Sequence, residues 1–394
     1  MWSKSARAAC YFLQKIFQAA QVATNEVGHE SLSKVKSMPA QCRKIGTRLP
    51  AILLVSATIA AAQGTQLAPP PTTQIPANHP AILFPPLPNT ALGQKAALMG
   101  SRGPKWDKVP DLEGSGPFPA TYAAAANGSD YVLYQPKNLA GAEAKGKLGV
   151  YVWGSGACSS DAAGSRFHLT EIASHGYVVI VPGKILSGPK APPRPEGTGP
   201  EPGTQDPGAR ATAEKMVAGI DWILAENQRQ GSPYFGAIDP ARIAVAGFSC
   251  GGLIALKAGF DPRVSVVLIE SSGILKDPPP AFAGLPQMTT LKKEDLDKLH
   301  TPVLYLLGGP EDIAESNGLD DFDHIHTVPV FLGDQPGAGH GGLISVPNAE
   351  GTKIELDWLD WQLNHDPIAA QTFTGPHCEL CRDFRWQVHR KAIP

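Results

Sequence analysis

The stretch Ala-Gly-Phe-Ser-Cys-Gly-Gly at residues 246–252 decides the fold. The apolar run at 242–247 that leads into it is typical of a buried strand, and the run at 253–258 that follows is typical of a helix. Ser249 therefore stands on a sharp strand-to-helix turn, where the flanking glycines allow the two backbones to approach closely. Such a turn holds a serine hydroxyl clear of the sheet as a nucleophile. The competing interpretation is a glycine-rich turn in which the serine only caps the helix.

Strand-like and helix-like segments alternate on either side of this turn. Short apolar or β-branched runs predict strands at residues 131–134, 148–153, 177–181, 264–269, 302–307 and 328–332. Apolar residues at helical spacing lie between or after them, at residues 167–175, 216–224 and 354–361. The alternation predicts an α/β fold with a mostly parallel central sheet and helices on both faces. Reactive groups in such folds lie at the carboxyl ends of the strands.

Two late strands end in loops that carry the partners of a serine nucleophile. Residues 308–314, Gly-Gly-Pro-Glu-Asp-Ile-Ala, follow one strand. Residues 333–342, Gly-Asp-Gln-Pro-Gly-Ala-Gly-His-Gly-Gly, follow the next. A serine nucleophile requires a base, and the base requires an acid that orients it. The order serine, acid, histidine along the chain suits a nucleophile on a strand-to-helix turn.

We predict that His340 is the base, because the flanking glycines leave its backbone free to place the ring. We predict that Asp312 is the acid, with Glu311 as the rival one residue away. Three further acids lie farther from the strand end and are expected to be solvated: Asp320, Asp321 and Asp323.

Backbone amides near Ser249 are expected to stabilise the negative oxygen of a tetrahedral intermediate. Cys250 opens the predicted helix, where its N–H has no acceptor within the helix. A second amide should come from the loop after the strand that ends at Trp153, which reads Gly-Ser-Gly-Ala-Cys at 154–158. We predict the N–H of Ser155 as this second donor. Trp153 itself is expected either to line the pocket or to be a core aromatic residue.

Taken together, these loops resemble the α/β-hydrolase superfamily over about residues 115–365. Within it they resemble a branch of secreted proteins related to dienelactone hydrolases and polyester hydrolases. In that branch the loops look like W-G-N-G-G-C, G-x-S-C-G-G, G-G-x-x-D-I-A and G-H-G-G. This chain has W-G-S-G-A-C at 153–158, with Ser155 in place of the asparagine and Ala157 in place of a glycine. The C-x-x-C and the tryptophan with which the branch ends are matched by Cys378, Cys381 and Trp386.

The resemblance implies a serine hydrolase that cleaves carboxylic esters through an acyl-enzyme on Ser249, with Asp312 and His340 as its partners. The substrate stays open between small-molecule and polymeric esters. Neither a cofactor nor a metal is expected, because no cluster of histidines and acids has ligand spacing. Two alternatives stay open: a binding protein that keeps the fold without catalysis, and a serine peptidase or acyltransferase on the same fold.

The first 62 residues are expected to be a basic extension that ends in a signal-peptide-like segment. They carry eight Lys or Arg and two acids, and residues 49–62 are an apolar run of 14. A membrane-spanning helix needs about 20 apolar residues, and a signal-peptide core about 7–15. Translation from Met38 would give an ordinary signal peptide, whereas a start at Met1 with an uncleaved segment would give a membrane anchor. In either case we expect the rest of the chain to be exported, to a secreted or periplasmic location.

The exported part is expected to contain a Pro-rich leader at 63–114 and a catalytic domain at 115–394. Beyond residue 62 the chain has 26 basic and 34 acidic residues, a net charge of −8, which gives no electrostatic reason to bind nucleic acid. A second Pro- and Gly-rich segment, 183–208, is expected either to wall the substrate cleft or to be a surface insertion.

Export favours disulfides among the cysteines beyond the signal-like segment. Cys158 ends the loop that carries one oxyanion amide, and Cys250 carries the other. Because both amides must lie about 3 Å from one oxygen, the two cysteines come near the Cα separation of about 4.4–6.8 Å that a disulfide needs. We predict this pair, against the alternative that Cys250 is only a small buried apolar residue. In the tail we predict Cys378–Cys381, rather than a redox pair or a zinc site that would need two more ligands.

Overall fold

The computed structural model describes residues 109–126, 130–193, 210–278 and 285–394. The basic extension and the apolar run expected at 1–62 lie outside the described residues, as does the leader expected at 63–114 except for its last residues. The Pro- and Gly-rich segment at 183–208 is described only as far as Pro193. Among the described residues, no helix is both long enough and apolar enough to cross a membrane.

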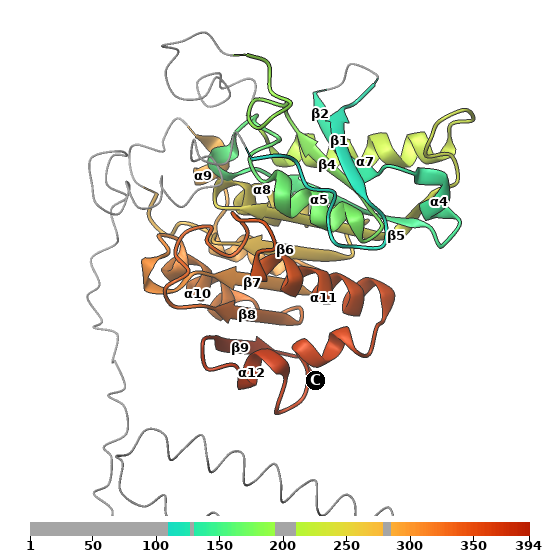
Figure 1. The fold of residues 1–394 in the computed structure, drawn as a ribbon. Coiled ribbons are helices and arrows are strands. Elements are labelled where there is room, and N and C mark those ends of the chain that lie inside the picture. Colours follow the sequence, from blue (N-terminus) through green and yellow to red (C-terminus); the bar gives the residue numbers. More distant parts are fainter. Residues whose placement is uncertain (1–108, 127–129, 194–209, 279–284) are drawn as a thin grey trace, which may run out of the picture. The chain divides into compact units, whose positions relative to one another are not determined.

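In this described part, nine strands form one mixed sheet in the order β1-β2-β4-β3-β5-β6-β7-β8-β9 (Figure 1). In chain order the strands are β1 (Ala120–Ala124), β2 (Tyr131–Pro136), β3 (Leu148–Gly154), β4 (Tyr177–Pro182), β5 (Ile238–Phe248), β6 (Val266–Glu270), β7 (Val303–Leu307), β8 (Val330–Asp334) and β9 (Gln387–Lys391). The strands from β4 to β8 in this order pair in parallel, whereas β1, β2 and β9 pair antiparallel at the two ends. The predicted α/β class with a mostly parallel sheet is confirmed, and the topology is consistent with an α/β-hydrolase-like fold.

Helices lie on both faces of this sheet, as predicted. They are α4 (Leu139–Glu143), α5 (Arg166–Ser174), α7 (Ala213–Gln228), α8 (Cys250–Ala258), α9 (Pro286–Thr289), α10 (Glu315–His324), α11 (Glu350–Asn364) and α12 (Glu379–Arg382). Helices α7 and α8 cover one face, and α5 and α11 cover the other (Figure 1). The carboxyl end of a strand is therefore connected by a loop to a helix that packs on the sheet, as β5 is connected to α8.

Two hydrophobic cores follow from the alternation of side chains along the strands. Val150 and Val152 of β3 belong to the core on the α7–α8 side, while Tyr151 and Trp153 belong to the core on the α5–α11 side. All four side chains are fully buried. Because both faces are covered, the central strands are apolar without alternation, which is why their runs are visible in the sequence. Of the two roles considered for Trp153, the structure shows the core one.

The two edge strands, β1 and β9, are not predicted by the sequence patterns. β9 reads Gln-Val-His-Arg-Lys, and its side chains are exposed or only partly buried. An edge strand pairs on one side only and tolerates polar and charged residues, which blunt its free edge. The apolar pattern that reveals a central strand is therefore missing here.

The expectation that Asp321 is solvated is wrong. Its side chain on α10 is fully buried, and its carboxylate lies 2.7 Å from the ammonium of Lys293. It also accepts hydrogen bonds from the Tyr305 hydroxyl at 3.1 Å and from the N–H of Ile274 at 2.9 Å. Burial raises the pKa of Asp321 to about 6, although Lys293 opposes the shift. Asp321 is thus a structural acid that ties α10 to the 3₁₀ turn Lys293–Lys298.

Candidate active site

Ser249 occupies a strained turn between β5 and α8. Its backbone has φ +55° and ψ −125°, a region that non-glycine residues enter at a cost of about 1–3 kcal/mol. The neighbouring glycines are required by space. A Cβ on Gly251 would lie 1.9 Å from the carbonyl oxygen of Gly154, and one on Gly247 would lie 2.2 Å from the carbonyl oxygen of Gly251. The end of β3, the end of β5 and the start of α8 therefore pack backbone to backbone around Ser249.

Ser249, His340 and Asp312 form a continuous hydrogen-bonded chain. Nε2 of His340 lies 2.9 Å from the Ser249 hydroxyl, and Nδ1 lies 2.7 Å from a carboxylate oxygen of Asp312. Because that carboxylate can only accept, the ring proton belongs on Nδ1, which leaves Nε2 to accept from the serine. The structure thus brings together the three residues predicted as nucleophile, base and acid.

The carboxylate of Asp312 is buried, and several donors hold it. Besides His340, the N–H of Ala314 donates at 2.9 Å and the N–H of Gly308 at 3.1 Å. Burial alone would raise the pKa of Asp312, but the hydrogen bond and charge of His340, the Ala314 amide and the Ser271 hydroxyl outweigh it and lower the pKa. Asp312 is therefore an ionised acceptor, as the orientation of an imidazole requires.

Glu311, the rival acid, has a different partner. Its carboxylate accepts the N–H of Gly337 at 3.0 Å and thereby links the acid loop to the base loop. A second link joins the same loops, because the N–H of Gly339 donates to the carbonyl of Gly308 at 2.7 Å. The two loops are so close here that a Cβ on Gly308 would lie 2.1 Å from the carbonyl oxygen of Gly339. Of the two acids, Asp312 is the one whose carboxylate contacts His340.

A second carboxyl pair lies under the acid loop. Asp334, at the end of β8, accepts the N–H of Gly309 at 2.6 Å. Its neighbour Glu315 begins α10, and burial together with the charge of Asp334 raises the pKa of Glu315 to about 7. The carboxyl pair of Asp334 and Glu315 therefore lies next to the loop that carries Asp312, and this pair retains a proton at mildly acidic pH.

The two amides predicted as oxyanion donors lie on adjoining backbones. Cys250 is the first residue of α8, and Ser155 follows β3 directly. Neither amide donates a hydrogen bond to another described residue, so both stay available to a ligand oxygen. The Ser155 side chain is engaged elsewhere, because its hydroxyl donates to the carbonyl of Asp161 at 3.2 Å. Ala157 has φ +56°, in the left-handed region that favours glycine.

Both predicted disulfides are present. Cys158 and Cys250 are bonded with a Cα separation of 5.1 Å, and Cys378 and Cys381 with a separation of 4.9 Å. Cys250 is therefore not a free buried thiol. The sulfurs of the tail pair are used by their mutual bond, so they are not zinc ligands here. The first disulfide joins the loop after Ser155 to the residue after the nucleophile.

Three consecutive residues at the end of β6, Glu270 to Ser272, were not predicted from the sequence and also contact this site. The carbonyl of Glu270 accepts the N–H of Ser249 at 2.9 Å, and the hydroxyl of Ser272 donates to the carbonyl of Ser249 at 2.7 Å. The hydroxyl of Ser271 accepts the N–H of Gly341, beside the base, at 3.1 Å. The signal that could have found them is their place at the carboxyl end of a predicted strand.

A buried polar cluster lies on the α5–α11 side of the sheet. The Tyr151 hydroxyl donates to Glu355 at 2.5 Å and lies 3.1 Å from Nε2 of His168. Burial, followed by the charge of Glu355, raises the pKa of Glu270 well above its usual value. The contact of Glu270 with Ser249 is made by its backbone carbonyl.

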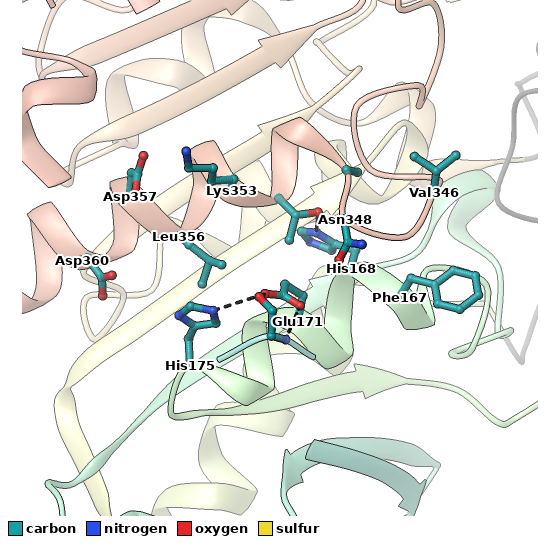
Figure 2. Close-up of a pocket in the computed structure, with 13 residues that line it drawn as sticks. Phe167, His168, Glu171, His175, Val346, Asn348, Lys353, Leu356, Asp357 and Asp360 are labelled. Atoms are coloured by element: carbon teal, nitrogen blue, oxygen red, sulfur yellow. Dashed lines mark hydrogen bonds and ion pairs between the residues drawn. The ribbon is translucent and has the colours of Figure 1, made fainter. Parts of the chain in front are cut away.

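Two cavities in the described part of the chain lie elsewhere. One, of about 370 Å³, lies between α5 and α11, and Figure 2 shows Glu171 and Lys353 on its opposite walls. The other, of about 310 Å³, lies between β1, β2 and α7. Neither is lined by Ser249, Asp312 or His340. We therefore locate the candidate active site by the contacts of its side chains rather than by cavity size.

A scan against protein-family models found no match for this chain, and a search of curated proteins found none either.

Proposed function

We propose that the protein is a serine hydrolase that cleaves carboxylic esters through an acyl-enzyme on Ser249. The observation that carries the proposal is the hydrogen-bonded chain from Ser249 through His340 to Asp312. Its position supports the same conclusion, because the three residues follow β5, β8 and β7, all at the carboxyl edge of the sheet.

In the proposed reaction, Ser249 attacks the ester carbonyl while Nε2 of His340 takes the hydroxyl proton. Asp312 holds the imidazole in the required tautomer and stabilises the imidazolium that forms. The amides of Ser155 and Cys250 donate to the oxyanion of the tetrahedral intermediate. His340 then protonates the leaving alcohol, and a water molecule hydrolyses the acyl-enzyme by the reverse sequence of proton transfers.

The family and the location belong to the same proposal. The α/β-hydrolase-like topology, the strained serine turn and the loop motifs support membership of the α/β-hydrolase superfamily, in its secreted dienelactone-hydrolase-like and polyester-hydrolase-like branch. The two disulfides support an extracytoplasmic location. The substrate is a small-molecule or polymeric ester, and the chemistry proposed requires no cofactor.

The main rival is a binding protein that keeps the fold without catalysis. The intact contacts of His340 with both partners argue against it, since a silent relative has no need to keep a buried, ionised Asp312 against the ring. A serine peptidase or acyltransferase would use the same residues. A peptidase would release an amine instead of an alcohol, and an acyltransferase would transfer the acyl group to an acceptor other than water. The experiment below distinguishes both from an esterase.

The test uses the purified protein with p-nitrophenyl acetate and a fluorophosphonate probe. We expect turnover and covalent labelling, both lost in Ser249→Ala and both retained in the control Ser265→Ala, whose hydroxyl lies at the amino end of β6 and donates to Ala241. Labelling that persists in Ser249→Ala, or a wild-type protein that neither turns over nor labels, contradicts the proposal. Peptide cleavage, or transfer of the acyl group to an added alcohol in preference to water, would assign the rival activities.

A further inference from the structure

Ser271 is a buried residue with an unusual backbone at the end of β6. Its side chain is fully buried, and its φ is +42°, in the left-handed region that favours glycine. Glycine would adopt this backbone without strain but would have no hydroxyl. The strained serine is therefore a reason to ask what its hydroxyl does.

The hydroxyl of Ser271 contacts both loops that flank the candidate base. It accepts the N–H of Gly341, the residue after His340, at 3.1 Å. It also lies beside the carboxylate of Asp312, whose pKa it helps to lower. Accepting from the Gly341 amide uses a lone pair of the hydroxyl oxygen and leaves its proton free. One oxygen atom thereby connects the acid with the backbone that carries the base.

We propose that Ser271 is a positioning residue for the ester hydrolysis proposed above, holding Asp312 and the His340 loop in register. The inference rests on that proposed function. The hydrogen bonds of Ser271 go to Gly341 and Leu306. It acts through Asp312 and His340, whose Nδ1–carboxylate distance of 2.7 Å sets the orientation of the imidazole.

The neighbouring contacts explain why this hydroxyl matters. The adjoining Glu270 and Ser272 bind the backbone of Ser249. The carbonyl of Glu270 accepts the Ser249 N–H at 2.9 Å, and the Ser272 hydroxyl donates to the Ser249 carbonyl at 2.7 Å. Ser271 holds the His340 loop through Gly341 and lies beside Asp312, so three consecutive residues at the end of β6 reach all three loops. Loss of the Ser271 side chain would leave Ser249 in place and would change the distance and angle between the Asp312 carboxylate and the His340 ring.

The experiment compares Ser271→Ala and Ser271→Gly with the wild type and with Ser265→Ala. The alanine variant removes the hydroxyl, and the glycine variant removes both the hydroxyl and the strain at φ +42°. Ser265→Ala removes a hydroxyl from the same strand region at its opposite end, where it donates to Ala241 at 2.7 Å. Far-UV circular dichroism first establishes that each variant is folded, and the glycine variant carries the test if the alanine variant is not.

We expect both Ser271 variants to lose about three- to tenfold in kcat for p-nitrophenyl acetate, as expected for loss of one hydrogen bond that orders the His340 loop, with KM almost unchanged. Removing the hydroxyl that helps to lower the pKa of Asp312 destabilises the deprotonated acid–base pair. The acid limb of the kcat/KM profile should therefore move to higher pH. The far-downfield proton NMR resonance of Nδ1–H in His340 should shift or broaden, a readout that does not depend on turnover.

A wild-type kcat and an unchanged Nδ1–H resonance in the variants would overturn the inference while leaving the proposed function intact. Recovery of wild-type kcat in Ser271→Gly alone would also overturn it, because strain rather than the hydroxyl would then be the cause. Failure of both variants to fold would assign Ser271 a purely structural role. An inactive wild type defeats the proposed function separately, and the resonance still reports whether Ser271 orders the Asp312–His340 pair.

Discussion

Removing the Cys158–Cys250 disulfide should cost much more stability than removing the Cys378–Cys381 disulfide. The first joins residues 92 apart in sequence and the second joins residues 3 apart. If a cross-link stabilises by restricting the unfolded chain, these loops are worth about 4–5 and about 2 kcal/mol respectively. We therefore expect the double alanine variant of the first pair to lose about 3 kcal/mol more in the free energy of unfolding than that of the second.

The assay is urea denaturation followed by tryptophan fluorescence, with the slope of the transition as an internal check. Without this cross-link the unfolded chain is more extended and exposes more surface. The dependence of the free energy of unfolding on urea concentration should therefore be steeper in the Cys158→Ala/Cys250→Ala variant. The tail variant, Cys378→Ala/Cys381→Ala, is the matched control, since it also replaces two bonded cysteines.

The same variant should lose activity as well as stability. Cys158 is bonded to the residue whose amide is the proposed oxyanion donor, and it lies three residues after Ser155, the other donor. Loss of a whole donor reduces kcat by about a hundred- to a thousandfold, so loosening two of them should reduce kcat on the order of tenfold. Equal stability losses for both pairs would refute the loop argument. An unchanged kcat in the folded long-loop variant would refute the coupling to the oxyanion site.

Three further outcomes follow from the site. Asp312→Asn should lower kcat by about four orders of magnitude with little change in fold, while Glu311→Gln stays near wild type; the reverse order in steady-state kinetics would exchange their roles. Gly251→Ala should abolish ester hydrolysis and lower the unfolding free energy by about 1–3 kcal/mol or more, because its Cβ would lie 1.9 Å from the Gly154 oxygen; normal activity would contradict the packing described. The pKa of Glu315 is about 7 in the folded protein and about 4.5 in the unfolded chain. Its contribution to the free energy of unfolding is therefore complete below pH 4.5 and is lost as the pH rises to about 7. Urea midpoints across that range should show this slope, and Glu315→Gln should remove it.

The sequence predicts the central sheet because parallel strands covered on both faces need continuous apolar runs, as β4 shows. It also predicts which loops meet, since parallel strands end at one edge, and this brings Ser249, Asp312 and His340 together. The polar edge strand β9 has no such requirement and is not predicted.

Side chains with long-range partners escape prediction for a different reason. Asp321 is buried because Lys293 and Tyr305, which lie in other segments of the chain, bind its carboxylate. The residues next to Asp321 in the sequence give no indication of these partners. Ser271 lies at a strand end and could have been considered. Its role depends on the backbone of a loop 70 residues away, which only the folded chain reveals.

The placement of β9 also has a consequence for how the chain is made. β9 pairs with β8, the strand that leads into the His340 loop, and the Trp386 ring before it packs against Gly333. A ribosome produces β8 well before β9, with α11 and α12 between them. Until Gln387–Lys391 emerge, the nascent chain has an open sheet edge at the strand that supports the base. Chaperone contacts that shield this edge would therefore act on β8 late in biosynthesis, after the Ser249 turn has already been synthesised.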